Sequence, residues 1–235
     1  MLNVAVRGGD GDNVAATVGV AGASLVPEGD DAVDVVVAVG DEAIRSAAAN
    51  PPDAPLLPVT PTGGRHLVAR ESLDGALAAL AADDGRVVAH PILGVRRDGS
   101  VVARALRDVM LVTAAPASIS EYAVTTAETV VQSVRADGVV LAAPMGSDGY
   151  AAAAGGSVLG ADTGVAVVPV APFSTAAETH VVDAADSLAV SVEREGDVAL
   201  FADGVRHGSV DCHTDLRIEH AGALDVLVPT RTENF

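Results

Sequence analysis

The sequence predicts an α/β domain followed by a β-rich domain, and three observations carry this prediction. The first 85 residues alternate short apolar runs with Ala-rich stretches, as strands and crossover helices do in a parallel sheet. From Arg86 onward, apolar and polar residues alternate at every second position. The second part also holds one glycine-rich turn, Ala143 to Gly156. We therefore expect a Rossmann-like domain over residues 1–85 and a β-sandwich-like domain over 86–235, with the C-terminal segment packing back on the first domain.

The composition indicates a sizeable core made of small side chains. The chain has 235 residues, of which 49% are hydrophobic and only 2% are aromatic. Ala and Val make up most of the apolar residues, and both are residues that proteins commonly bury. We expect the core to depend on many small contacts, because few large side chains are present to anchor it.

Strands and helices alternate through the first predicted domain. Each apolar run stops at Gly, Pro or Asp residues. The Ala-rich stretches suit short helices, and Ser72 is the expected N-cap of the last one. The expected strands are Leu2–Val6, Val33–Val39 and Pro55–Val59, and the expected helices are Asn13–Val20, Glu42–Ala49 and Ser72–Ala82.

Half-buried strands dominate the second predicted domain. In each of three segments, apolar residues fall on one face of an extended chain. The exception is Ser147–Gly155, whose small residues predict a short helix that opens out of the glycine-rich turn. The three alternating sets are Val101, Ala103 and Ala105; Leu188, Val190 and Val192; and Leu216 and Ile218.

The charge pattern predicts adaptation to high salt. The net charge is −18, and all 14 basic residues are Arg. Such an acid excess repels itself in dilute buffer, whereas at molar salt the screening length falls to about 3 Å. We therefore expect a protein of a salt-loaded cytoplasm. An ordinary acidic protein from a GC-rich genome is the alternative, and it accounts less well for the acid excess.

Charge and hydropathy also exclude several partners. A surface for nucleic acid needs clustered Lys and Arg, which this acidic chain lacks. The sequence has no run of about 18 apolar residues and no basic segment ahead of an apolar one, so we expect neither a membrane span nor a signal peptide. Cys212 is the single cysteine, so no intrachain disulfide forms.

The glycine-rich turn is the first candidate for binding. A turn of small residues leading into a helix lets backbone N–H groups approach an anion or the edge of a base, and the helix N-terminus adds a favourable dipole. The same pattern also fits a tight strand-to-helix turn whose glycines serve geometry alone. The local pattern leaves both interpretations open.

Asp41, after Gly40, is the second candidate. It follows a predicted strand, and ligands of α/β sheets bind at the carboxyl ends of the strands. Its carboxylate is therefore a candidate general base or metal ligand. The alternative is that Asp41 serves only as the N-cap of the next helix.

Other polar clusters carry less weight. Asp203-Gly204 is a hairpin-turn signal. The loop Gly8–Asp12 is interpreted as a flexible acidic turn, and a chain without Lys has no Walker-type phosphate loop. The spacing of the C-terminal His and Cys residues fits no ordinary zinc site, so we expect no metal held by His207, Cys212, His213 and His220.

Taken in order, these motifs resemble those of the NAD kinase family, from about Asp34 to Val228. Asp137-Gly138 and the turn through Tyr150 are similar to the family's Asp-Gly strand and Thr-Pro-Thr-Gly-Ser-Thr-Ala-Tyr turn. Further matches follow at the family's spacing. They are Ala154-Gly155-Gly156 for Ala-Gly-Gly, Val168–Ser174 where Pro-His-Ser is usual, and Asp203-Gly204 for a later Asp-Gly.

The resemblance implies an enzyme that transfers a phosphoryl group from ATP, or from polyphosphate in some members, to the 2′-hydroxyl of the adenosine ribose of NAD. It implies Mg²⁺ bound with ATP, an active site in the cleft between the two domains, and a homo-oligomer, either a dimer or a tetramer. Asp41 takes the position of the family's general base. The residues at family positions for nucleotide or NAD contact are Gly40, Arg107, Asp108, Asp137, Gly146, Ser147, Asp148 and Tyr150.

Five positions depart from the family motifs. Where the family has Gly-Gly-Asp-Gly-Thr, Glu42 and Ala43 follow Asp41, which puts a carboxylate where phosphate is expected. Arg107 replaces an Asn, and Arg only donates to an adenine edge where Asn both donates and accepts. Asp148 replaces a Thr and Phe173 a His. Two other hypotheses therefore stay open: a catalytically weakened paralogue that binds a nucleotide as a sensor or partner subunit, and a kinase of the same fold for another small substrate.

Overall fold

The computed structural model describes residues 1–9, 11–115, 118–194 and 196–230. The chain divides into two compact units. One is Met1–Ala89 together with the segment that begins at Leu224, and the other is His90–Ala223. The division falls inside two long strands, whereas the change of pattern in the sequence put it at residue 85. No helix in the described ranges is both long and apolar enough to cross a membrane.

A parallel sheet forms the centre of the first unit. Its strand order is β17-β4-β3-β1-β2, and β5 also pairs with β4. All six predicted elements are confirmed, with ends within two residues of the expected ones. The elements are β1 (Asn3–Arg7), α1 (Gly11–Val20), β2 (Ser24–Leu25), β3 (Val35–Val39), α2 (Asp41–Ala49), β4 (Leu56–Thr60), β5 (Val68–Ala69), a 3₁₀ turn (Arg70–Ser72) and α3 (Leu73–Ala81).

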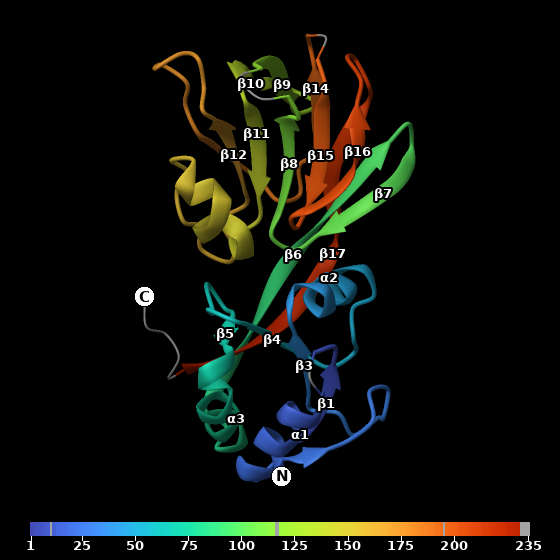
Figure 1. Ribbon diagram of the computed structural model, residues 1–235, viewed down its shortest axis with the longest axis vertical. Helices are drawn as coiled ribbons and strands as arrows, with labels where there is room; N and C mark the ends of the chain where they lie inside the picture. Colours follow the sequence, from blue (N-terminus) through green and yellow to red (C-terminus); the bar gives the residue numbers. More distant parts are fainter. Residues whose placement is uncertain (10, 116–117, 195, 231–235) are drawn as a thin grey trace. The chain divides into compact units, whose positions relative to one another are not determined.

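Helices cover both faces of this sheet, because its central strands are apolar on both sides (Figure 1). Val35 and Val37 belong to a buried cluster with residues of α1 and α3. Val36 and Ala38 alternate with them and point to the other face, where α2 packs on β3 and β4. Ser72 occupies the N-cap of α3 as expected but makes no capping hydrogen bond with its side chain.

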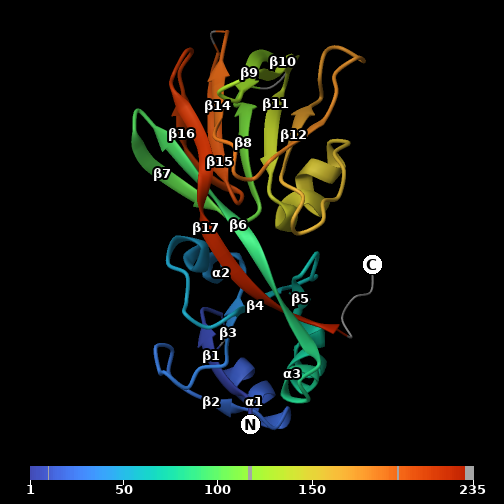
Figure 2. The ribbon, with the colours of Figure 1, turned by 180° about the vertical axis from the view of Figure 1, so that it is seen from behind.

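Two antiparallel sheets form the second unit (Figure 2). One has the order β13-β12-β11-β8-β15-β16, and the other has the order β10-β9-β14-β17, with the β6-β7 hairpin joined to it through β17. The strands are β6 (Gly85–Arg97), β7 (Ser100–Ala105), β8 (Asp108–Thr113), β9 (Ser120–Thr125), β10 (Val130–Ala136), β11 (Gly138–Ala142), β12 (Val165–Val170), β13 (His180–Val182), β14 (Leu188–Val192), β15 (Val198–Ala202), β16 (Val205–Val210) and β17 (Leu216–Pro229).

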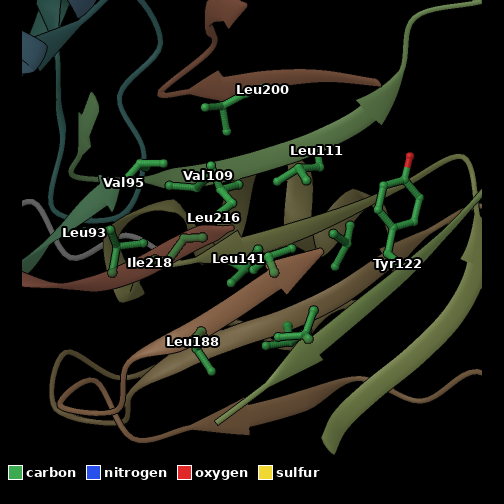
Figure 3. Close-up of a cluster of buried hydrophobic side chains, with 14 of the residues drawn as sticks. Leu93, Val95, Val109, Leu111, Tyr122, Leu141, Leu188, Leu200, Leu216 and Ile218 are labelled. Carbon is green, nitrogen blue, oxygen red and sulfur yellow. The ribbon is translucent and has the colours of Figure 1, made fainter. Parts of the chain in front are cut away.

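The core of the second unit is built from every second residue of these strands (Figure 3). Leu111 and Leu141 come from one sheet, and Leu188 and Tyr122 from the other. The predicted alternation is confirmed in all three segments apart from Val101, which is 49% exposed beside the β6-β7 turn. Apolar inner faces on both sheets make this unit a sandwich.

Candidate functional site

Three neighbouring strands of the six-stranded sheet carry candidate residues at one end. β8 lies between β11 and β15 and runs antiparallel to both (Figure 1). The start of β8 therefore lies beside the carboxyl ends of the other two strands. This arrangement brings together Arg107-Asp108 at the start of β8, the glycine-rich turn after β11 and Asp203-Gly204 after β15.

The glycine-rich turn packs directly on the backbone of Arg107. The Ala143 N–H donates to the Arg107 carbonyl oxygen at 2.8 Å. A Cβ on Gly146 would lie 2.3 Å from that oxygen and 2.7 Å from the Arg107 Cα. Glycine at 146 is thus required by close approach of two backbones. The turn, whose residues 143–147 are buried, therefore packs directly against the half-buried Arg107-Asp108 segment.

The helical segment after the turn begins where the sequence predicts, but it is irregular. A 3₁₀ turn (Pro144–Gly146) leads into a π-helical turn (Ser147–Ala151). Gly149 interrupts it with φ −89° and ψ −123°, which are not helical angles. The segment lies against β11 and β12 on one face of the sheet (Figure 2).

The predicted binding residues of this segment differ in what they expose. Ser147 is fully buried: its hydroxyl donates to the Pro144 carbonyl at 2.8 Å and accepts from the Leu159 N–H at 2.9 Å. Ser147 therefore holds the loop together and does not present its hydroxyl at the surface. Asp148 and Tyr150 are exposed, with 48% of Tyr150 accessible.

Asp108 is half-buried at the start of β8, and its pKa is raised from 3.8 to about 6. Burial is the main cause, the carboxylate of Asp203 adds to it, and the Arg107 guanidinium partly offsets it. At neutral pH the group is mostly a carboxylate, which accepts hydrogen bonds from hydroxyl or amino groups. A mildly acidic medium converts it into a donor.

Asp203 is the functional candidate that sequence reasoning undervalued. It is 4% exposed, and its carboxylate accepts the backbone N–H groups of Leu106 at 2.9 Å, Arg107 at 2.7 Å and Asp108 at 3.1 Å. Its own N–H donates to the Asp108 carbonyl at 2.9 Å. The available sequence signal was the match to the later Asp-Gly of the resembled family.

Asp137 and Phe173 lie at the other end of the same sheet. Asp137 precedes β11, a five-residue strand that spans roughly 17 Å, whereas Gly146 follows it. The Asp137 carbonyl accepts from the Tyr122 hydroxyl at 3.2 Å, and burial raises the Tyr122 pKa so that this donor stays neutral. Phe173 is 72% exposed, with the Arg135 guanidinium 5.6 Å from its ring centre. Within one chain, Asp137 is not brought together with the other predicted residues of this unit.

Gly40 and Asp41 lie in the first unit, at the carboxyl end of β3. Gly40, with φ 87°, is the N-cap of α2, so the alternative that Asp41 is the N-cap is wrong. Asp41 is the first residue of the helix and is exposed, as is Glu42. Two acids in a first turn are favourable, because the helix dipole is positive there.

The loop after β1 packs beside this motif. A Cβ on Gly8 would lie 2.7 Å from the Ala43 Cβ, and one on Gly9 would lie 2.6 Å from the Val39 Cβ. The two glycines thus fit closely against the end of β3, while Asp10 lies outside the described residues. β1 and β3 are neighbours at the point where the strand order reverses, which is where α/β sheets bind ligands.

None of the residues that the structure describes form a group of three or more His, Cys, Asp or Glu able to hold a metal ion. Cys212 is a half-buried free thiol. His213 lies 3.7 Å from a Glu193 carboxylate oxygen at the surface.

The profile of the ATP-NAD kinase C-terminal domain matches residues 106–227, which include Arg107-Asp108, the glycine-rich turn and Asp203-Gly204. The chain belongs to the ATP-NAD kinase family. The NAD kinase of Methanospirillum hungatei is 26% identical over 133 residues, which are 56% of this chain and 46% of the relative. The NAD kinase of Symbiobacterium thermophilum is 34% identical over 188 residues, 73% of this chain and 65% of the relative. The chain spans less than half the length of the first curated relatives it matches.

Two solved structures of such kinases are similar to this family member. Yeast NADH kinase, complexed with NADH, has a TM-score of 0.76 at 15% identity and covers 99% of this chain and 84% of its own. An NAD kinase from Archaeoglobus fulgidus, in complex with ATP, has a TM-score of 0.70 at 21% identity, and the match covers 100% of this chain and 96% of that kinase's chain. At these identities the likeness shows the fold, a mixed α/β sheet domain plus an antiparallel β-sheet domain, which confirms the predicted fold class.

Proposed function

We propose that this family member is an NAD kinase that transfers a phosphoryl group from ATP to the 2′-hydroxyl of the adenosine ribose of NAD, giving NADP. The observation that carries the proposal is the direct packing of the glycine-rich turn against the Arg107-Asp108 segment. Both segments lie within the residues that match the family profile. The two similar solved structures are complexes with NADH and with ATP.

The proposal assigns NAD to the second unit. Asp108 accepts hydrogen bonds from the adenosine part as a carboxylate, and Arg107 donates to it. The turn presents the exposed Asp148 and Tyr150, while the buried Gly146 and Ser147 act through the shape of the loop. Gly146 packs on Arg107, and both hydrogen bonds of the Ser147 hydroxyl are internal. Asp137 is also assigned to NAD contact, and this assignment depends on the family resemblance alone.

Asp41 is the proposed general base. It takes the proton of the ribose 2′-hydroxyl as that oxygen attacks the terminal phosphorus of ATP, and ADP leaves with the electrons of the broken P–O bond. Such a proton transfer contributes about 10²–10⁴-fold to the rate. Mg²⁺ enters with ATP as part of the substrate, and Gly40, the residue before the base, is assigned to nucleotide contact by the family resemblance. The role of Asp41 depends on the family resemblance and on its place after β3.

The test is the formation of NADP from ATP-Mg and NAD in molar KCl. Wild type should form NADP, and Asp41→Asn should be at least about 100-fold slower. Asp53→Asn, an exposed acid of the same unit, is the matched control and should keep the wild-type rate. Wild-type activity no higher than that of Asp41→Asn would refute the proposal.

A catalytically weakened paralogue, acting as a sensor or partner subunit, is the second candidate. The specific observation in its favour is Glu42, which is exposed next to Asp41 and would repel a phosphate. Ala43, Arg107, Asp148 and Phe173 are further departures that favour it. NAD binding without NADP formation would select this candidate. If the protein neither binds NAD nor forms NADP, the result favours a kinase of another small substrate. Arg107 would suit an acidic substrate.

We further propose that the protein works as a homo-oligomer in a salt-loaded cytoplasm. The net charge of −18 and the absence of Lys support the salt adaptation. Its unfolding temperature should rise steeply from about 0.1 M to about 3 M KCl, because added salt shortens the screening length. An unchanged unfolding temperature would contradict this. Light scattering should give a multiple of 23.3 kDa, as a dimer or a tetramer requires.

A further inference from the structure

Asp203 ties the β15-β16 turn to the segment before β8. Its carboxylate accepts three consecutive backbone N–H groups, those of Leu106, Arg107 and Asp108, at 2.7–3.1 Å. Its backbone N–H donates to the Asp108 carbonyl. Four hydrogen bonds from one residue therefore fix the conformation of the segment that presents the Arg107 and Asp108 side chains.

The turn itself does not require an aspartate. Asp203 and Gly204 connect β15 to β16 with φ 47° and φ 76°, as a two-residue type I′ turn needs. The chain makes a second such turn with the same dipeptide: Asp98 and Gly99 connect β6 to β7 with φ 50° and φ 79°. Asp98 is exposed, and Asn suits this turn type at least as well as Asp.

The difference between the two turns is the burial of the carboxylate. Asp203 is 4% exposed, and burying a charge is costly unless hydrogen bonds compensate for it. A carboxylate only accepts, so both of its oxygens can face N–H groups, whereas an Asn amide would turn an NH₂ group toward one of them. The geometry at Asp203 thus selects a carboxylate, and the segment that it serves is the one proposed to bind NAD.

We infer that Asp203 is a positioning residue of the nucleotide site, which holds Arg107 and Asp108 in place through their backbone N–H groups. The inference rests on the proposed function for the identity of the ligand, NAD. Asp203 does not itself contact NAD. It acts through the two residues that do.

The charge of Asp203 also influences Asp108. In the described part of the chain, the charged groups acting on Asp108 are Asp203, from the β15-β16 turn, and Arg107, its neighbour in sequence. The β11 residue paired with Asp108 is Ala142, which carries no charge. Replacing Asp203 by a neutral residue lowers the pKa of Asp108 from about 6, although burial keeps it above the ordinary value.

The test compares Asp203→Asn with Asp98→Asn, which makes the same change in the same kind of turn. We expect Asp203→Asn to fold, to lose amide hydrogen-exchange protection at residues 106–108 and to weaken NAD binding about 10- to 100-fold by calorimetry. The acid limb of NAD binding, which is the fall in NAD affinity as Asp108 is protonated, should also move to lower pH. Asp98→Asn should match wild type in all three measurements.

The outcomes separate this inference from the proposed function. If the wild-type protein binds no NAD, the proposed function is refuted. Amide hydrogen exchange at residues 106–108 still tests in that case whether Asp203 anchors this segment. Unchanged protection in Asp203→Asn overturns the inference. Wild-type NAD affinity in that variant, or weaker binding with an unmoved acid limb, overturns it as well.

Discussion

Replacing Gly146 with Ala should damage both the stability and the proposed binding site. The new Cβ would lie 2.3 Å from the Arg107 carbonyl oxygen, more than 1 Å inside the ordinary contact distance of 3.4 Å. The nearest atoms are backbone, so no side chain can rotate away. Overpacking of this kind costs about 1–3 kcal/mol. Moving the Arg107 carbonyl also breaks its hydrogen bond with Ala143, which costs about 0.5–1.5 kcal/mol.

We therefore expect Gly146→Ala to lose about 2–4 kcal/mol in the free energy of unfolding, measured by urea titration in molar KCl. A displacement of about 1 Å at the Arg107-Asp108 segment should also reduce kcat/KM for NAD by about 100-fold. The matched control is Gly75→Ala in α3, where no atom outside the neighbouring residues and the helix's own backbone lies within 4 Å of the new Cβ. Because Ala favours a helix over Gly, this control should gain up to about 1 kcal/mol. Wild-type stability and wild-type kinetics in Gly146→Ala would refute the packing argument.

Two further substitutions test the same surface. Ser147→Ala removes the partner of the buried Leu159 N–H, while the Pro144 carbonyl keeps its hydrogen bond from the backbone N–H of residue 147. The change should lower the free energy of unfolding by about 1–3 kcal/mol, and a change below about 0.5 kcal/mol in urea titration would contradict this. Asp108→Asn tests the raised pKa: the folded state binds a proton more readily than the unfolded state, so wild-type stability should fall as the pH rises from about 4 to about 6. Between these pH values, the urea midpoint of the variant should rise relative to that of wild type. If the two midpoints change with pH in parallel, the raised pKa of Asp108 is contradicted.

The elements of the first unit were predictable because their signals are local. Val35–Val39 is apolar at every position, which is typical of a strand covered on both faces, and Gly40 stops it. The identity of the N-cap was not predictable, since Asp is the commoner capping residue and the φ of 87° at Gly40 is a property of the folded chain. The fit of Gly8 and Gly9 against Val39 and Ala43 is a contact between segments about 30 residues apart, which no local pattern contains.

The candidate site was predictable only in part. The glycine-rich turn and Arg107-Asp108 were found through motif order, but the reason for Gly146 is a contact with Arg107, 39 positions earlier in the chain. Asp203 looked like a turn residue because Asp-Gly is a hairpin-turn signal, and its burial, which separates it from the exposed Asp98 in the same kind of turn, is a property of the folded chain. Asp137 is close to the turn in sequence yet far from it in space, since a strand carries the chain across the sheet between them.

The NAD affinity of three proteins tests the central claim, that the surface of the second unit binds NAD and that Asp41 acts in catalysis. Calorimetry in molar KCl should show wild type and Asp41→Asn binding NAD equally well. Gly146→Ala should bind at least about tenfold more weakly, because the Arg107-Asp108 segment is displaced. The account would be contradicted by full binding in Gly146→Ala together with lost binding in Asp41→Asn.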